Sequence, residues 1–340
     1  MKYRKLGTTG LKVSELSLGV MNFGQWANAD EAEAERILSR SIEAGINLVD
    51  TADVYSQGES ERILGRLLAR RSDRDDIIVA TKFNGQIGKG LNSRGNSRHW
   101  IRRAVEGSLS RLALDHIDLY QIHRPDADAS LDDTLGTLSD LVREGKIRYY
   151  GTSTFSGHQL TDARLTAVAR NRELPSTEQL PYSILAREAE REVLDVTLKY
   201  GIGTLIWSPL AGGWLAGKEH AAGNSRVARQ PERHALDIED NRTKLAVVEK
   251  LQVIADDAGI PLPQLAIAFV LANRAVSTVL LGPRTPDQLE GLLPSTDVVL
   301  TPDVLDAIDA ASFPGRTINP ADTGYSRAAG LERVTAQRAH

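Results

Sequence analysis

Residues 30–50, DEAEAERILSRSIEAGINLVD, contain one complete helix-to-strand unit. Asp30 is a good N-cap, glutamates follow in the first turn, and Gly45 is typical of the end of a helix. The short apolar run 46–50 comes next and ends in a carboxylate, as buried parallel strands often do. This stretch therefore predicts a helix over 30–44 that leads directly into a strand.

The same unit recurs along the chain, and Lys199-Tyr200-Gly201-Ile202-Gly203 repeats its junction of helix end, glycine and strand. The apolar runs expected to be strands are 16–20, 46–50, 77–82, 117–123, 147–152, 175–180, 202–207 and 277–282. Helical patterns cover 30–44, 59–70, 97–112, 130–144, 186–200, 241–258 and 263–273. Eight strands alternating with about eight helices predict an α/β protein with a parallel sheet, closed as a (β/α)8 TIM barrel and followed by extra C-terminal helices. We expect a single domain over 1–340.

Three segments lie outside this alternation of strands and helices. The stretches 3–6 and 12–15, joined through Thr8-Thr9-Gly10, predict an N-terminal β-hairpin that could close the barrel bottom. A long basic loop, 208–240, follows the seventh strand, and a loop of that length is usually functional or disordered. The C-terminal tail, 313–340, is either a loose terminus or a segment that wraps over the barrel mouth.

Composition excludes several classes of protein. The 41 basic and 45 acidic residues give a net charge of −4, so we expect no nucleic-acid partner. The absence of cysteine excludes disulfides, thiolate metal sites, iron–sulfur clusters and a cysteine nucleophile, and it fits a reducing cytoplasm. No histidines have a His-x-x-x-His spacing, and no apolar run or signal peptide suggests a membrane. We expect a cytoplasmic protein without a metal site, either a monomer or a weak homo-oligomer.

Four polar residues come at or just after the ends of predicted strands. Asp50 ends the second strand and Tyr55 follows five residues later, while Lys82 ends the third strand and His123 ends the fourth. The active site of a (β/α)8 barrel lies at the carboxyl ends of its strands. Each residue alone has an ordinary structural explanation. Four such groups at one mouth, however, perturb each other's pKa and indicate a site.

At these residues the chain resembles the aldo-keto reductase superfamily, from about Tyr3 to Leu293. It is most similar to the bacterial branch that also contains potassium-channel β subunits and deoxysugar reductases. The resemblance is carried by Asn47-Leu48-Val49-Asp50-Thr51-Ala52-Asp53-Val54-Tyr55, Gly58-Glu59-Ser60-Glu61-Arg62-Ile63-Leu64-Gly65, Ala80-Thr81-Lys82, Asp118-Leu119-Tyr120-Gln121-Ile122-His123-Arg124-Pro125-Asp126 and Leu141-Val142-Arg143-Glu144-Gly145-Lys146-Ile147-Arg148-Tyr149-Tyr150-Gly151.

The resemblance implies a catalytic tetrad of Asp50, Tyr55, Lys82 and His123 for reduction of a carbonyl group. We expect the charge of Lys82 to lower the pKa of Tyr55, so that Tyr55 donates a proton near neutral pH. Asp50 then holds the lysine in place. His123 is expected to orient the carbonyl and to stabilise the developing oxyanion.

A hydride donor is required, and the first strand is not followed by a Gly-x-Gly-x-x-Gly motif. The resemblance implies NADP(H) lying extended across the barrel top. Ser153 and Gln179 are expected to hold the nicotinamide carboxamide, Trp207 to stack on its ring, and Arg284 to bind the 2′-phosphate. The full set of expected cofactor contacts is Val20, Met21, Asp50, Ser153, Gln179, Trp207, Ser208, Leu210, Gly212, Lys218, Arg226, Gly282, Arg284 and Gln288.

Two positions depart from the family pattern. Ser153-Thr154 stands where relatives have Ser-Asn or Ser-Arg, and Gly291-Leu292 replaces a Glu-Asn pair near the adenine.

The substrate is expected to be an aldehyde or ketone at an apolar, aromatic mouth. Its expected contacts are Phe23, Trp26, Tyr55, Phe83 and His123. Two alternatives stay open: a reductase of nucleotide-activated deoxysugars, and a cofactor-sensing regulatory protein like a channel β subunit. The complete tetrad, with no long basic segment before the barrel, favours an enzyme. A hydrolase is disfavoured because the chain has no Gly-x-Ser-x-Gly motif.

Overall fold

The predicted barrel is confirmed by the computed structural model, which describes residues 1–25, 30–217 and 231–324. Eight parallel strands close in the order β10-β3-β4-β5-β6-β7-β8-β9. Their bounds are β3 Leu16–Gly19, β4 Leu48–Asp50, β5 Ile78–Phe83, β6 Ile117–Ile122, β7 Ile147–Ser153, β8 Thr177–Pro181, β9 Gly203–Trp207 and β10 Thr278–Leu281. The predicted runs differ from these bounds by one or two residues at their ends.

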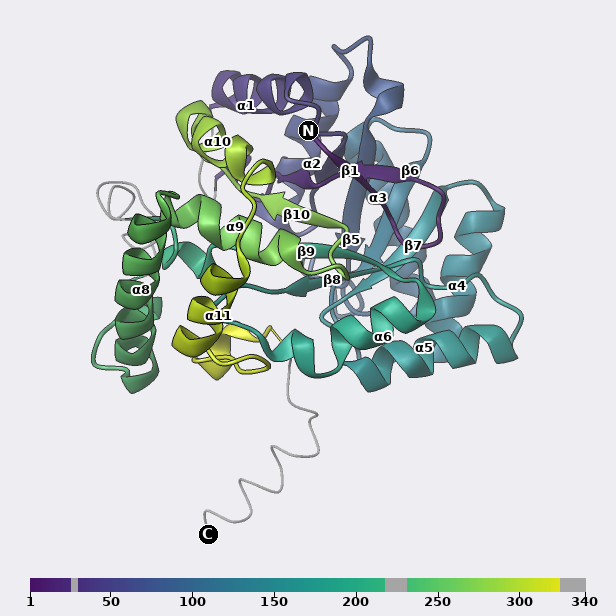
Figure 1. The fold of residues 1–340 in the computed structure, drawn as a ribbon. Helices are drawn as coiled ribbons and strands as arrows, with labels where there is room; N and C mark the ends of the chain where they lie inside the picture. Colours follow the sequence, from purple (N-terminus) through teal and green to yellow (C-terminus); the bar gives the residue numbers. More distant parts are fainter. Residues whose placement is uncertain (26–29, 218–230, 325–340) are drawn as a thin grey trace.

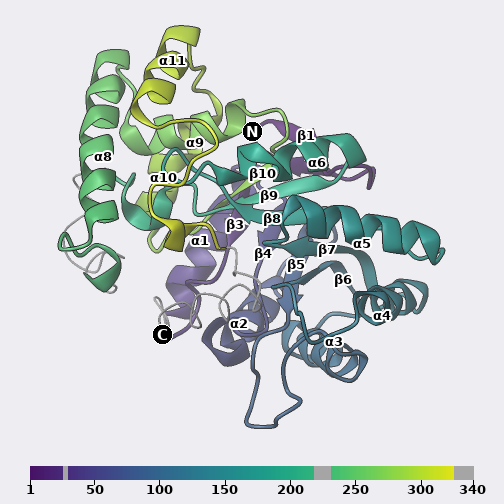
Figure 2. The same cartoon turned by 90° about the horizontal axis from the view of Figure 1, so that it is seen from below.

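Helices surround the barrel, as Figures 1 and 2 show from two directions. They are α1 Glu31–Glu43, α2 Glu59–Leu68, α3 Arg98–Leu112, α4 Leu131–Arg143, α5 Gly157–Ala169, α6 Val193–Tyr200, α8 Glu239–Ala258, α9 Leu262–Ala272, α10 Pro286–Leu292 and α11 Pro302–Ala311. The sequence patterns did not predict α5, and they expected extra C-terminal helices without giving bounds for α10 or α11. The predicted helix over 186–200 is shorter, because a 3-10 turn at Glu188–Arg191 precedes α6.

The predicted hairpin closes the barrel bottom. Strands β1 Tyr3–Lys5 and β2 Lys12–Ser14 pair antiparallel, and Leu6 and Val13 are fully buried with residues from the barrel strands. Gly7 has a left-handed φ of 55°, and a Cβ there would lie 2.4 Å from the backbone nitrogen of Gly203 at the start of β9. Only glycine therefore lets the hairpin turn approach the lower ends of the strands so closely.

The first part of the predicted tail packs on the body of the protein. Thr317 forms a β-bridge with Ala186, and Asp322 forms an ion pair of 2.9 Å with Lys244 of α8. A Cβ at Gly324 would lie 2.9 Å from the ring of Trp207, so this segment reaches the barrel mouth. Residues 325–340 lie outside the described part of the chain.

Within the described residues, no single helix has the length and apolar character needed to cross a membrane. The helices α8 and α9 meet that test only as a pair, and they are bent by 92° relative to each other.

Candidate active site

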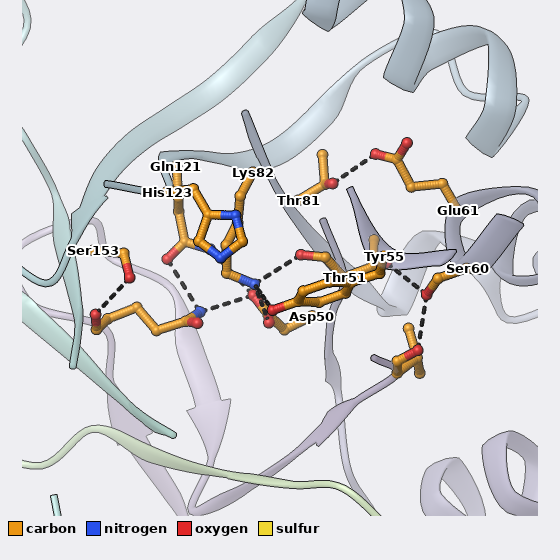
Figure 3. Close-up of polar contacts among 12 residues, drawn as sticks. Asp50, Thr51, Tyr55, Ser60, Glu61, Thr81, Lys82, Gln121, His123 and Ser153 are labelled. Carbon is orange, nitrogen blue, oxygen red and sulfur yellow. Dashed lines mark hydrogen bonds and ion pairs between the residues drawn. The ribbon is translucent and has the colours of Figure 1, made fainter. Parts of the chain in front are cut away.

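The predicted catalytic side chains gather at the carboxyl ends of adjacent strands (Figure 3). Asp50 is the last residue of β4, and Lys82 of β5 lies in register with Gln121 of β6. The following loops are fixed by the sheet's backbone: the N–H of Asp53 donates to the Lys82 carbonyl, and that of His123 to the Phe83 carbonyl. The barrel itself therefore brings the four groups together.

Lys82 and Asp50 form a buried ion pair at the centre of this arrangement. The lysine side chain is 1% exposed, and its Nζ donates to Asp50 Oδ1 at 2.5 Å, to the Thr51 carbonyl at 2.8 Å and to Tyr55 Oη at 3.5 Å. Burial lowers the pKa of Lys82, but the charges and hydrogen bonds of Asp50 and Tyr55 together outweigh it, and the net pKa is raised. The ammonium is therefore charged, with one acceptor for each of its three protons.

The second oxygen of Asp50 accepts two amide hydrogen bonds. Gln179 Nε2 donates to Oδ2 at 2.8 Å, and Gln121 Nε2 donates to it at 3.1 Å. We did not predict Gln121 as a site residue. The signal was present, because side chains alternate along a strand and Gln121, two residues before His123, shares its face.

Tyr55 stands on a tight turn that follows β4. Ser56 and Gln57 adopt left-handed φ values of 49° and 55°, and Ser60 ties the turn to the barrel by bonding with Thr51 and with the carbonyl of Val20. The Tyr55 ring meets the His123 ring edge to face, with centroids 5.8 Å apart. The two expected proton donors thus share one small space above Lys82.

The pKa of Tyr55 differs from the expectation. Burial raises it, Lys82 lowers it and Asp50 raises it, so the net pKa lies above its ordinary value rather than below. The reason is that burial of the phenol has the largest effect and the charge of Asp50 opposes that of Lys82. Burial, with the charges of Lys82 and Arg124, holds the pKa of His123 well below its ordinary value. Near pH 7 the site therefore presents a protonated phenol and a neutral imidazole.

An elongated cavity of about 430 Å³ opens beside these groups. Most of the expected cofactor contacts line it: Met21, Asp50, Ser153, Gln179, Trp207, Ser208, Leu210, Gly212, Gly282, Arg284 and Gln288. Tyr55 and His123 line it as well, together with Asn22, Arg124 and Arg233, which were absent from the predicted contacts.

Three expected contacts lie in the hydrophobic core instead. Val20, Phe23 and Phe83 are at most 1% exposed, and none lines the cavity. Phe83 stacks on Tyr120, because it is adjacent to Lys82 in β5 and so faces the surrounding helices rather than the barrel interior. Trp26, Lys218 and Arg226 lie outside the described residues.

At the far end of the cavity, Arg284 is positioned by its own loop. Its backbone N–H donates to Gln288 Oε1 at 2.9 Å, and Asn22 ties the loop to β3 by donating to the carbonyl of Gly282 at 2.8 Å. Leu292, one of the two residues that depart from the expected Glu-Asn pair, also lines the cavity and gives it an apolar side chain there.

Three backbone N–H groups of the turn after β9 are already engaged in hydrogen bonds. The N–H groups of Ala211, Gly212 and Gly213 are all donated within the turn, to the Ser208 carbonyl, Ser208 Oγ and the Leu210 carbonyl respectively. Ser208 and Gly212 adopt left-handed φ values of 58° and 69° to close the turn. Side-chain cations are therefore the stronger candidates to bind phosphate.

The fold and this geometry define a class: a (β/α)8-barrel protein whose mouth holds a protonated phenol above a buried lysine, next to an elongated cavity. Comparison with known proteins gives the family. The sequence profile of the Aldo/keto reductase family matches residues 15–312, and the chain belongs to this family of oxidoreductases, which generally use NAD(P)H.

Named relatives cover nearly the whole chain. An uncharacterized oxidoreductase, YrpG, of Bacillus subtilis (strain 168) is 38% identical over 324 residues, 93% of this chain and 97% of the relative. Probable voltage-gated potassium channel subunits beta from Oryza sativa subsp. japonica and Arabidopsis thaliana are each 37% identical. These matches cover 93% and 91% of this chain, and 99% and 96% of the respective relatives.

Proposed function

We propose that this protein reduces an aldehyde or ketone to an alcohol, with NADPH as hydride donor and Tyr55 as general acid. The observation that carries the proposal is the hydrogen bond of 3.5 Å between Lys82 Nζ and Tyr55 Oη, at the wall of the cavity. The Bacillus subtilis relative is named an oxidoreductase, which supports catalysis.

The cavity residues fit a nicotinamide dinucleotide. Gln179 Nε2 donates to Asp50 Oδ2 and to Gln121 Oε1, and its Oε1 is the acceptor proposed for a carboxamide, with Ser153 and Trp207 also lining the cavity. Gly282 lines the wall without a side chain, and a Cβ there would come within 3.4 Å of Asn22. The fit supports Gln179 and Ser153 as holders of the carboxamide, with Trp207 against the ring.

Two arginines support NADPH over NADH. Arg284 and Arg233 both line the cavity, and a guanidinium binds a phosphate through two parallel hydrogen bonds. Because Gln288 holds the backbone of Arg284, we assign the 2′-phosphate to the Arg284 side chain.

Side chains of the protein itself would donate the proton and stabilise the group that loses it. When bound, NADPH supplies the hydride that the carbonyl carbon takes up, leaving NADP⁺. Tyr55 Oη donates its proton to the carbonyl oxygen, which becomes the hydroxyl of the alcohol, and solvent later returns a proton to the tyrosine. Lys82 stabilises the phenolate formed in this step, and Asp50 keeps the lysine charged and in place. Neutral His123 donates a hydrogen bond to the same oxygen and orients it.

The plant relatives favour one alternative, a regulatory protein that binds the cofactor and reports its state, since they are named channel subunits. Both possibilities require the same cofactor site, so binding alone does not separate them. The test is oxidation of NADPH, followed by absorbance, with a panel of aliphatic, aromatic and sugar aldehydes and ketones. Turnover of at least one carbonyl supports the reductase, whereas tight NADPH binding without turnover of any supports the regulatory protein.

A further inference from the structure

Arg124 stands between two cavities. It follows His123 directly, and it lines both the elongated cavity of about 430 Å³ and a second cavity of about 680 Å³. The second cavity lies between the loops that follow β5 and β6, and its lining is polar. Its charged residues besides Arg124 are Arg94, Arg98, Asp126, Asp128 and Asp133, and its other polar residues are Asn84, Asn92, Asn96, Ser97 and Ser130. A substrate whose carbonyl lies at Tyr55 would extend past Arg124 into this second space.

Hydrogen bonds hold both the backbone carbonyl and the guanidinium group of Arg124. Its carbonyl oxygen accepts from Asn96 Nδ2 at 3.1 Å and from Asn84 Nδ2 at 3.5 Å. At the other end, Nη1 donates to Thr154 Oγ1 at 2.8 Å and to the carbonyl of His123 at 3.3 Å. The guanidinium is therefore held in place, and Nε and Nη2 are the donors that remain for a ligand.

Two of the residues that form hydrogen bonds with Arg124 have strained backbones. Asn84 has a φ of 126° and Thr154 a φ of 56°, and a left-handed conformation is unfavourable for a β-branched residue such as threonine. Such strain persists where the surrounding structure enforces it, and it concentrates at functional sites. At Thr154 the left-handed turn places the hydroxyl where it accepts from Arg124.

Other arginines with little exposure form ion pairs with carboxylates. Arg111 pairs with Glu61 at 2.6 Å, and Arg187 pairs with Glu190 and Asp309 at 2.8 and 2.7 Å. Among the described residues, Arg124 has no such ion pair. Arginines shielded from water are usually matched by an anion, so this charge lacks its counterpart.

The buried carboxyl of Glu178 attracts the charge of Arg124 but forms no ion pair with it among the described residues. It accepts from Thr152 Oγ1 at 2.5 Å and from the N–H of Phe155 at 3.1 Å. Burial raises the pKa of Glu178 to about 8, so at pH 7 the group is mostly neutral.

We infer that Arg124 is a specificity-determining residue that binds an anionic group, a carboxylate or a phosphate, on the carbonyl substrate. The inference rests on the proposed reduction and narrows its substrate to anionic aldehydes or ketones with a polar body. Two of the expected aromatic contacts, Phe23 and Phe83, lie in the core, while asparagines line the space next to Arg124.

The first test compares matched substrates on the full-length wild-type protein with NADPH. The carboxylate pair is 4-carboxybenzaldehyde and its methyl ester, and the phosphate pair is glyceraldehyde 3-phosphate and glyceraldehyde. We expect the anionic member of at least one pair to have a kcat/KM about 30-fold higher, as one charge-assisted hydrogen bond gives. Which pair shows the preference identifies the anion. Equal kcat/KM within both pairs would overturn the inference.

The second test removes the guanidinium. Arg124→Gln should abolish the preference, lowering kcat/KM for the anionic member about 30-fold more than for the neutral member. Arg124→Lys should retain part of the preference. The matched control is Arg102→Gln, an exposed arginine of α3 that pairs with Glu144, and it should leave the preference intact. Equal losses for both members would mean that Arg124 only supports the structure, and would overturn the inference.

A binding readout separates this inference from the proposed function. By calorimetry without NADPH, wild-type protein should bind benzoate more tightly than benzamide, and Arg124→Gln should bind both alike. If no carbonyl is reduced but this difference is seen, the proposed reduction fails while the anion site stands. If neutral carbonyls are reduced, and neither substrate pair nor benzoate shows an advantage for the anion, the reduction stands and the anion site fails.

Discussion

The ion pair between Lys82 and Asp50 gives the sharpest prediction about stability. The change is Asp50→Asn, which keeps the shape of the side chain and removes its charge. The two charged atoms lie 2.5 Å apart, and both side chains are at most 4% exposed. Removing one partner of a buried pair typically costs about 3–5 kcal/mol of unfolding free energy. The loss cannot greatly exceed this value, because Lys82 can instead be buried as a neutral amine. Deprotonating a lysine at pH 7 costs about 4–5 kcal/mol.

The size of this loss should depend on pH. In the wild type, the raised pKa of Lys82 means that its contribution is fully present below the pKa of an unfolded lysine and is lost only at higher pH. In Asp50→Asn, burial without the counter-charge lowers the pKa of Lys82, so the variant regains stability as the pH rises from about 7 to 10. The difference between the two proteins should therefore shrink over that range.

Urea unfolding at several pH values measures this directly. The double variant Asp50→Asn/Lys82→Met should recover at least about 2 kcal/mol of the single variant's loss, because no charge is left buried. Glu144→Gln is the matched surface control, since Arg102 and Glu144 are 40% and 37% exposed, and it should cost at most about 1 kcal/mol. A loss below about 1 kcal/mol for Asp50→Asn, or strictly additive effects, would refute the reasoning.

Two further predictions concern the cofactor and a buried acid. Arg284→Ala should raise the KM for NADPH about tenfold or more and change the KM for NADH little, since only NADPH carries the 2′-phosphate; a wild-type preference for NADH would contradict the assignment. Glu178 has a folded pKa of about 8, above its unfolded value of 4.5, so its contribution to stability falls as the pH rises between these values. Glu178→Gln should flatten the pH dependence of urea unfolding between about pH 5 and 8, and an unchanged slope would argue that Glu178 is ionised in the folded protein.

Much of the barrel could be predicted because its strands are buried on both sides and its helices carry clear end signals. The helix α5 was missed for a physical reason: Gly157–Ala169 lacks a strong amphipathic pattern. Its N-terminus nevertheless carried a readable signal, the capping box formed by Ser156 and Gln159.

The catalytic residues could be placed at one mouth because parallel strands carry their carboxyl ends to one side of a barrel. Alternation along β5 and β6 would also have assigned Gln121 to the site and Phe83 to the core. The direction of the Tyr55 pKa could not be predicted, because it depends on the balance between burial and the opposed charges of Lys82 and Asp50. That Arg124 forms no ion pair among the described residues could not be predicted either, because this depends on which carboxylates the fold brings near it.

The most direct test of the proposed reaction is a single-turnover experiment with Tyr55→Phe, which removes one hydroxyl and keeps the ring. NADPH bound to excess protein is mixed with a reactive aldehyde, and the absorbance of the reduced cofactor is followed. The wild type should oxidise its bound NADPH in one rapid phase. Tyr55→Phe should bind NADPH with the same Kd, measured by fluorescence, and oxidise it about 10²–10⁴-fold more slowly. Equal rates for the two proteins would contradict the role of Tyr55 as the acid.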